Sequence, residues 1–190
     1  DATTRDLNEQ LIENRNLMAL LEQYKDALDK STLVSKTDTR GVITYSNSRF
    51  CELSGYSEAE LIGQPHSIVR HPDTPKSVFE GMWKQLQAKE IWTGMLQNRK
   101  KDGSSYYVHA TIFPIFDEHG EVFEYMALRE DLTSMIMYEK NLEDQRKRLH
   151  QILDNQDSVV VLTTKVGRVE FLNKKFFDYF NFNNIDDFLI

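Results

Sequence analysis

The segment spanning residues 64–74 carries the side chains best suited to hold a ligand. Prolines at positions 65, 72 and 75 predict irregular backbone with at most one helical turn, and ligands are commonly held by backbone of this kind. Arg70 can form paired hydrogen bonds with a pyrophosphate, and His71 and Asp73 lie beside it. In a simpler interpretation, Arg70 and Asp73 form a salt bridge within the loop and His71 caps local backbone.

Asn98 lies in a later apolar segment, and its amide can both donate and accept hydrogen bonds. It therefore suits the carbonyls and ring nitrogens of a planar heterocycle bound in an apolar slot. Taken alone, the two tryptophans, Trp83 and Trp92, are explained most simply as residues of the hydrophobic core.

Catalysis is not indicated by any pattern in these residues. The sequence contains no phosphate-binding glycine loop, no kinase or nucleotide-cyclase motif and no nucleophile with an adjacent base. His150 falls in a segment of helical character that leads towards a second domain, so it is interpreted as a surface residue rather than a phosphoacceptor. We therefore expect these 190 residues to have no catalytic activity of their own.

Composition restricts the partners. A net charge of -7 argues against electrostatic binding of nucleic acid. The longest apolar run is far below the ~20 residues that span a bilayer, and the first residues lack the features of a signal peptide. Cys51 is the single cysteine, so it has no internal disulfide partner and a reducing compartment fits. We therefore expect a cytoplasmic location, with no membrane span in this segment.

The first thirty residues predict a long helix, because they contain neither glycine nor proline. Apolar residues recur at heptad spacing, at Leu7, Leu11, Met18, Leu21 and Leu28, which is typical of a coiled coil. We expect this helix to form a homodimer; the alternative is an amphipathic helix packed on its own domain.

The next hundred residues predict a sheet with helices on one face. Segments 33–38 and 42–46 resemble a hairpin, short helices follow, a longer helix covers residues 76–86, and three strands span residues 92–100, 104–116 and 122–130. This order implies an α+β fold, with a five-stranded antiparallel sheet, helices gathered on one face and a pocket between them. A second helix, with apolar residues near heptad spacing, is expected from Thr133 to about Leu153.

An internal repeat follows that helix. Gly41, Asn47 and Phe50 recur as Gly167, Asn173 and Phe176, with the same offset throughout. A repeat of this length indicates a duplicated domain. We therefore expect a dimerisation helix at 1–30, a complete domain at 31–133, a linker helix at 134–154 and the first part of a second domain at 155–190, with exposed apolar surface and disorder or unusual strand pairing.

Residues 33–133 resemble a PAS domain. The resemblance is carried by the sequence from Gly41 to Asn47, by Leu53-Ser54-Gly55-Tyr56, and by the ending Arg129-Glu130-Asp131-Leu132-Thr133. Within that superfamily the chain is similar to the flavin-binding PAS domains of bacterial aerotaxis receptors. The supporting motifs are Gly63-Gln64-Pro65-His66 with Val69-Arg70-His71-Pro72-Asp73, then Met82-Trp83, then Trp92-Thr93-Gly94 and the segment from Asn98 to Gly103.

That resemblance implies a site for FAD between the sheet and the short helices. By position, Arg70, His71 and Asp73 would line it, Trp92 would lie near the flavin-adenine moiety, and Asn98 would face the isoalloxazine ring. Asn47 is a further candidate. The implied function is a sensor that reports redox state or oxygen to a downstream output domain of the same chain, such as a histidine kinase, a diguanylate cyclase or a chemoreceptor module.

Three alternatives remain open from the sequence. One is a cofactor-free dimerisation module, in which the pocket is ordinary core. A haem site is disfavoured because the helix near residues 76–88 has no histidine. Covalent flavin photochemistry is disfavoured because Cys51 precedes the irregular loop instead of lying in it.

Overall fold

The computed structural model describes residues 2–182, and the chain divides into two compact units, Asp1–Ser134 and Met135–Ile190. The first unit contains α1 (Ala2–Ser31), β1 (Leu33–Thr37), β2 (Ile43–Ser46), α2 (Ser48–Ser54), α3 (Glu58–Leu61), the 3-10 helix η1 (His66–Val69), α4 (Lys76–Gln87), β3 (Trp92–Arg99), β4 (Ser105–Phe116) and β5 (Val122–Asp131). In the rest of the described chain follow α5 (Thr133–Asp154), β6 (Val161–Thr163), β7 (Val169–Leu172) and α6 (Lys174–Phe180).

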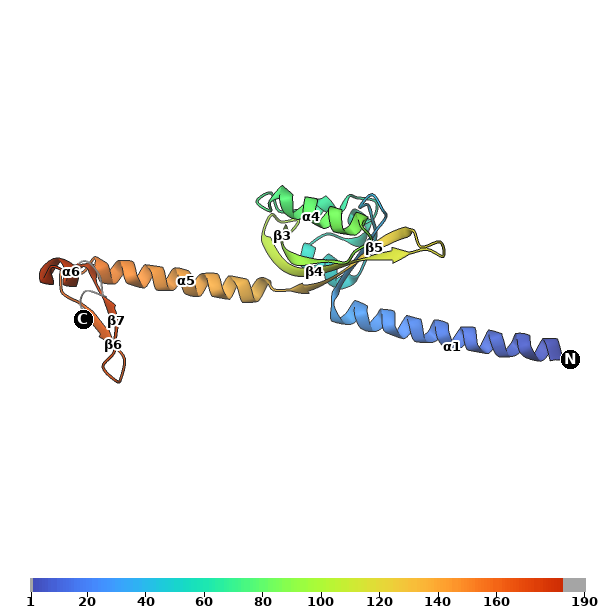
Figure 1. Ribbon diagram of the computed structural model, residues 1–190, viewed down its shortest axis with the longest axis horizontal. Helices are drawn as coiled ribbons and strands as arrows, with labels where there is room; N and C mark the ends of the chain where they lie inside the picture. Colours follow the sequence, from blue (N-terminus) through green and yellow to red (C-terminus); the bar gives the residue numbers. More distant parts are fainter. Residues whose placement is uncertain (1, 183–190) are drawn as a thin grey trace. The chain divides into compact units, whose positions relative to one another are not determined.

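The sheet of the first unit has five antiparallel strands in the order β2-β1-β5-β4-β3. Its long strands alternate in burial, so that every second residue of β4 faces the interior. Helix α4 lies over one face of this sheet (Figure 1). The α+β fold expected from the sequence is confirmed, with strand bounds within about two residues of those predicted.

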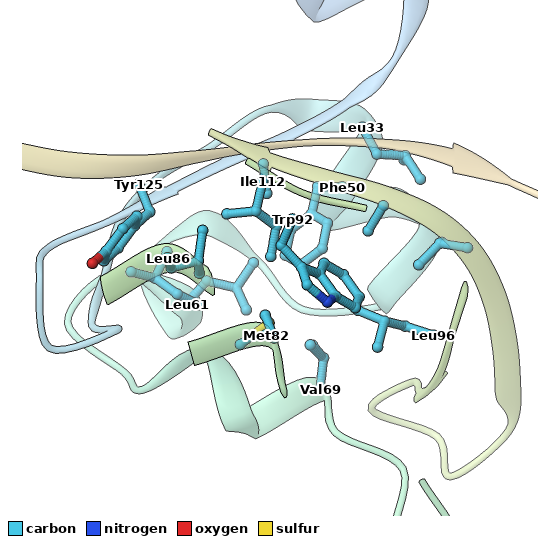
Figure 2. Packing of buried hydrophobic residues seen from close by; sticks show 14 of the residues in the cluster. Leu33, Phe50, Leu61, Val69, Met82, Leu86, Trp92, Leu96, Ile112 and Tyr125 are labelled. Carbon is cyan, nitrogen blue, oxygen red and sulfur yellow. The ribbon is translucent and has the colours of Figure 1, made fainter. Parts of the chain in front are cut away.

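The hydrophobic core fills the space between that face of the sheet and the short helices (Figure 2). Phe50 and Leu61 enter it from α2 and α3, Leu86 enters from α4, and Val108 and Ile112 enter from β4. The core is continuous with the wall of a pocket, because several of its apolar residues also line that pocket.

Local signals set the short helices. Asn47 caps α2 by accepting a hydrogen bond from the backbone amide of Phe50, and Gly55 ends the helix with a φ of 77°, a conformation that favours glycine. A capping box opens α3, where the Glu60 carboxylate accepts from the Ser57 backbone amide at 3.0 Å.

The second unit repeats the opening of the first. Its hairpin has the same register, since Val161 pairs with Leu172 as Ser35 pairs with Ser46, and Gly167 turns the chain at the φ of 83° found at Gly41. This regular hairpin contradicts the expectation of disorder or unusual pairing for residues 161–172. Val161 and Leu162 are exposed. The last eight residues of that predicted domain lie outside the described residues.

Candidate ligand-binding pocket

A cavity of about 230 Å³ lies in the first unit, between the inner face of the sheet and the elements from η1 to α4. One wall is apolar and is formed by Phe79, Met82, Trp83, Leu86, Leu96, Ile112, Tyr125 and Ala127. The polar lining consists of Ser35, Thr37, Arg40, His66, Ser67, Arg70, Asn98 and Arg129. An apolar slot with a few converging polar groups is the usual form of a small-molecule site.

Two of the predicted site residues meet in this pocket. The backbones of Arg70 and Asn98 form an isolated antiparallel bridge, which ties the loop after η1 to strand β3. The Arg70 guanidinium stacks on the Phe79 ring at 3.6 Å from its centroid. Both side chains line the cavity, and both are residues that the sequence predicts for the site.

The other four predicted residues lie outside the pocket lining. His71 accepts a hydrogen bond through Nδ1 from the Asp73 backbone amide, at 3.2 Å, and the Asp73 carboxylate is largely exposed. This geometry matches the simpler interpretation of His71 as a cap on local backbone. Trp92 is buried at the start of β3, within the hydrophobic core.

Asn47 is occupied by structural hydrogen bonds. Its side-chain oxygen accepts from the backbone amides of Val34 and Phe50, and its amide donates to the backbone carbonyls of Asp29 and Thr32. All four bonds are 2.8 to 3.0 Å long. Asn47 therefore joins the end of α1 to β1 and α2 and has no capacity left for a ligand.

Asn173 makes the matching set of bonds in the second unit. Its oxygen accepts from the amides of Val160 and Phe176, and its amide donates to the carbonyls of Leu153 and Ser158. Asparagine thus recurs at the equivalent position of both units because its side chain connects a helix to the hairpin that follows it.

Arg129, His66 and Ser35 form a polar cluster that sequence analysis did not single out as a site. Arg129 is 3% exposed, and its two terminal nitrogens lie 2.9 Å from Ser35 Oγ and 2.9 Å from His66 Nε2. The inward direction of Arg129 could have been found from strand periodicity, because Tyr125, Ala127 and Arg129 alternate along β5.

Burial and charge fix the protonation of this cluster. Burial, followed by the nearby charge of Arg129, lowers the pKa of His66 to about 3, so that His66 is neutral at neutral pH. Because burial lowers the pKa of Arg129 only to about 10, its guanidinium remains charged. His66 therefore accepts the Arg129 hydrogen bond through an unprotonated Nε2.

Four buried polar atoms in this region have no hydrogen-bond partner: Arg70 Nε, Asn98 Nδ2, Tyr106 Oη and Arg129 Nε. The Tyr106 hydroxyl is close to the Asn98 side chain, so a small shift would join those two groups. Arg70 Nε and Arg129 Nε are buried in the pocket wall without a hydrogen-bond partner. Buried polar groups are normally satisfied, so unpaired donors around a cavity indicate a site for a ligand that accepts hydrogen bonds.

Among residues 2–182, no three histidine, cysteine or acidic residues are grouped so as to hold a metal ion. In the same described range, no helix is both long and apolar enough to cross a membrane. Cys51 lies on α2, 3.5 Å from Ser46 Oγ, outside the pocket lining. The His150 ring packs on Phe171, with their centroids 4.8 Å apart.

Residues 43–129 match the family model described as the PAS fold. The chain contains a PAS domain. It is 43% identical to the aerotaxis receptor of Escherichia coli (strain K12) over 112 residues, which are 59% of this chain and 22% of that receptor. It is 32% identical to the nitrogen fixation regulatory protein of Klebsiella pneumoniae over 139 residues, or 73% of this chain and 28% of the relative.

Solved structures agree with this assignment. The crystal structure of the PAS domain of a protein from Colwellia psychrerythraea has a TM-score of 0.56 and 25% identity, and the match covers 60% of this chain and 98% of that one. A structure from work on the light-oxygen-voltage domain mechanism with a flavin analogue has a TM-score of 0.55 and 24% identity, covering 67% of this chain and 96% of that one. The chain spans about a quarter of the length of these two curated relatives.

Proposed function

We propose that this PAS domain binds FAD in the described pocket and reports redox state or oxygen to an output domain. The observation that carries this proposal is the set of unpaired buried donors around an apolar slot, because a flavin ring offers carbonyl and nitrogen acceptors along one edge. A light-oxygen-voltage structure studied with a flavin analogue has the same fold.

The pocket residues fit the ring end of such a cofactor. A cavity of about 230 Å³ is smaller than sites that enclose a whole drug-sized ligand, which have volumes of about 300–1,000 Å³. We therefore infer that the ring occupies the slot beside Leu96 and Ile112, with Asn98 as a hydrogen-bonding partner. Arg70 then serves the pyrophosphate, for which paired donors are suited. Bound FAD supplies reversible electron transfer.

The route from pocket to output follows strand β5. Arg129 faces the cavity, and two residues later Asp131 accepts hydrogen bonds from the backbone amide and the hydroxyl of Thr133, the first residue of α5. The Tyr107 amide in turn donates to Thr133 Oγ1 at 3.0 Å. A change in the hydrogen bonds of Arg129 would therefore act two residues along the strand from Asp131, which holds the start of α5. Such a local trigger on a helix start suits a two-state switch.

The visible absorption spectrum of the purified chain, with the released cofactor identified by mass, tests this function. The bands of oxidised flavin, with FAD in the released fraction, would support it. A folded, colourless protein that binds no FAD on reconstitution would contradict it.

Dimerisation is a second candidate function, favoured by the surface of α1. Its heptad residues Leu7, Leu11, Met18, Leu21 and Leu28 are 39 to 68% exposed. We propose that a second copy of this helix covers them, which stays compatible with FAD binding. Sedimentation should show a dimer that dissociates when Leu7→Asp and Leu21→Asp are combined. An unchanged mass would refute the coiled coil.

We further propose that the protein acts in the cytoplasm and carries its output domain, with any catalytic activity, in the same polypeptide. The matched segments are only 22% and 28% of these two relatives, which supports the presence of further domains in such proteins. Fusion of α5 to a reporter output module would test whether the reduction state of FAD passes through this helix.

A further inference from the structure

Arg129 is a buried cation that has no acidic partner in the described part of the chain. Its side chain lies in the pocket wall at 3% exposure, and both of its side-chain hydrogen bonds go to neutral groups, Ser35 Oγ and His66 Nε2. Its Nε has no partner, and the Phe50 ring lies 5.2 Å from its guanidinium carbon. No carboxylate among residues 2–182 forms an ion pair with it.

This arrangement is costly for the free protein. A charge removed from water is normally compensated by an opposite charge, and hydrogen bonds to neutral acceptors recover only part of the lost hydration. A buried cation without a counterion therefore indicates a role other than stabilising the fold. Charged groups in such unfavourable surroundings are commonly found at ligand-binding sites.

A purely structural role for Arg129 is weakened by its neighbours. Ser35 Oγ and His66 Nε2 are 3.2 Å apart, so the serine hydroxyl can donate to the histidine without the arginine. The hydrogen bond from the Thr32 hydroxyl to residue 129 goes to its backbone carbonyl, which any side chain leaves in place. The cluster thus does not need a guanidinium to satisfy its other members.

We propose that Arg129 is a second anion-binding group of the pocket, in addition to Arg70, and that it pairs with a negatively charged or acceptor-rich edge of the ligand. This inference rests on the proposed function where the ligand is FAD. Uptake of two electrons and one proton by a flavin leaves one negative charge on its ring, and a fixed buried cation favours that form. Arg129 thereby raises the midpoint potential of the bound flavin and couples its charge to strand β5.

The first experiment needs no ligand. Thermal unfolding of the FAD-free chain is compared for the wild type, Arg129→Met and the control Arg99→Met, in which an exposed arginine of β3 is replaced. We expect Arg129→Met to raise the Tm by about 4 °C or more, because an unpaired buried charge is removed. The control should leave the Tm nearly unchanged. A lower Tm, or failure of Arg129→Met to fold, would show that the arginine is structural and would overturn the proposal.

The second experiment measures FAD affinity and midpoint potential by titration. Arg129→Gln serves beside Arg129→Met, because a glutamine can keep hydrogen bonds to Ser35 and His66 without the charge. Both variants should bind FAD at least about tenfold more weakly, and their potentials should fall by about 30 mV for each tenfold selective loss in binding of the reduced form. Wild-type affinity and potential in Arg129→Gln would overturn the inference while leaving FAD binding intact.

The two proposals fail separately. If the wild type binds no FAD but Arg129→Met stabilises the free chain, the redox-sensor function fails and the anion site stands with a different ligand. If the wild type binds FAD and Arg129→Met only destabilises the protein, the function stands and the anion site fails.

Discussion

Replacement of Asn47 tests whether this residue is a structural joint or a cofactor contact. In Asn47→Ala, the backbone amides of Val34 and Phe50 lose their acceptor, and both residues are buried, at 4% and 0% exposure. The carbonyls of Asp29 and Thr32 lose a donor at the same time. Helix α1 would thus lose its hydrogen bond from Asn47 to Asp29, and Thr32, which follows the helix, would lose the other.

The expected loss follows from the two buried amides. A buried donor left without a partner costs about 1–3 kcal/mol, so Asn47→Ala should lower the free energy of unfolding by about 2–6 kcal/mol. The two carbonyls are left out of this sum, because at the end of an exposed helix water can replace their donors. Against a total stability of about 5–15 kcal/mol for a typical domain, this is a large fraction.

Urea unfolding followed by tryptophan fluorescence is the assay, because both tryptophans, Trp83 and Trp92, belong to the first unit. Asn173→Ala is the matched control, since it removes the same set of bonds from the second unit and should leave this transition in place. FAD affinity of folded Asn47→Ala should equal that of the wild type. An unchanged unfolding midpoint together with weaker FAD binding would refute the reasoning and restore Asn47 as a cofactor residue.

Three further predictions concern the pocket and its walls. The pKa of His66 is lowered to about 3 in the folded protein, so as pH falls below about 6.5 the unfolded chain binds a proton at His66 that the native state does not. The free energy of unfolding should therefore fall by about 2 kcal/mol between pH 7 and pH 5 through this residue. In urea unfolding, His66→Gln should lack this part of the pH dependence, and a pH dependence equal to that of the wild type would contradict the prediction. Gly94→Ala places a methyl group 2.7 Å from Trp92 Cζ2, so it should destabilise the protein by about 1–3 kcal/mol and shift the tryptophan emission. The control Gly81→Ala should not destabilise it, because beyond the backbone of its own helix and its chain neighbours nothing lies within 4 Å of the new carbon. Asn98→Leu removes a buried amide that lies beside the Tyr106 hydroxyl, so it should cost at most about 1–3 kcal/mol in urea while FAD affinity falls by about tenfold. The same stability loss with unchanged FAD binding would assign Asn98 to the core.

The sequence alone determined the order of elements and their boundaries, because those signals are local. Alternating apolar residues marked β4, Gly41 marked the hairpin turn, and the spacing of Ser57 and Glu60 marked the start of α3. The repeat with its constant offset also correctly placed a second hairpin. The strand alternation, the glycine turn and the helix cap each depend on residues close together in the sequence, so no tertiary information was needed to read them.

Membership of the pocket was decided only by tertiary structure. Arg129 meets Ser35 because β5 pairs with β1 across 94 positions of sequence, and His66 reaches them from η1. Conversely, His71 and Asp73 are next to Arg70 in sequence but lie outside the pocket lining, while Asn47 is directed into the joint with α1. Residue type and spacing show what a side chain can bind, whereas the register of distant strands determines which side chains share one cavity.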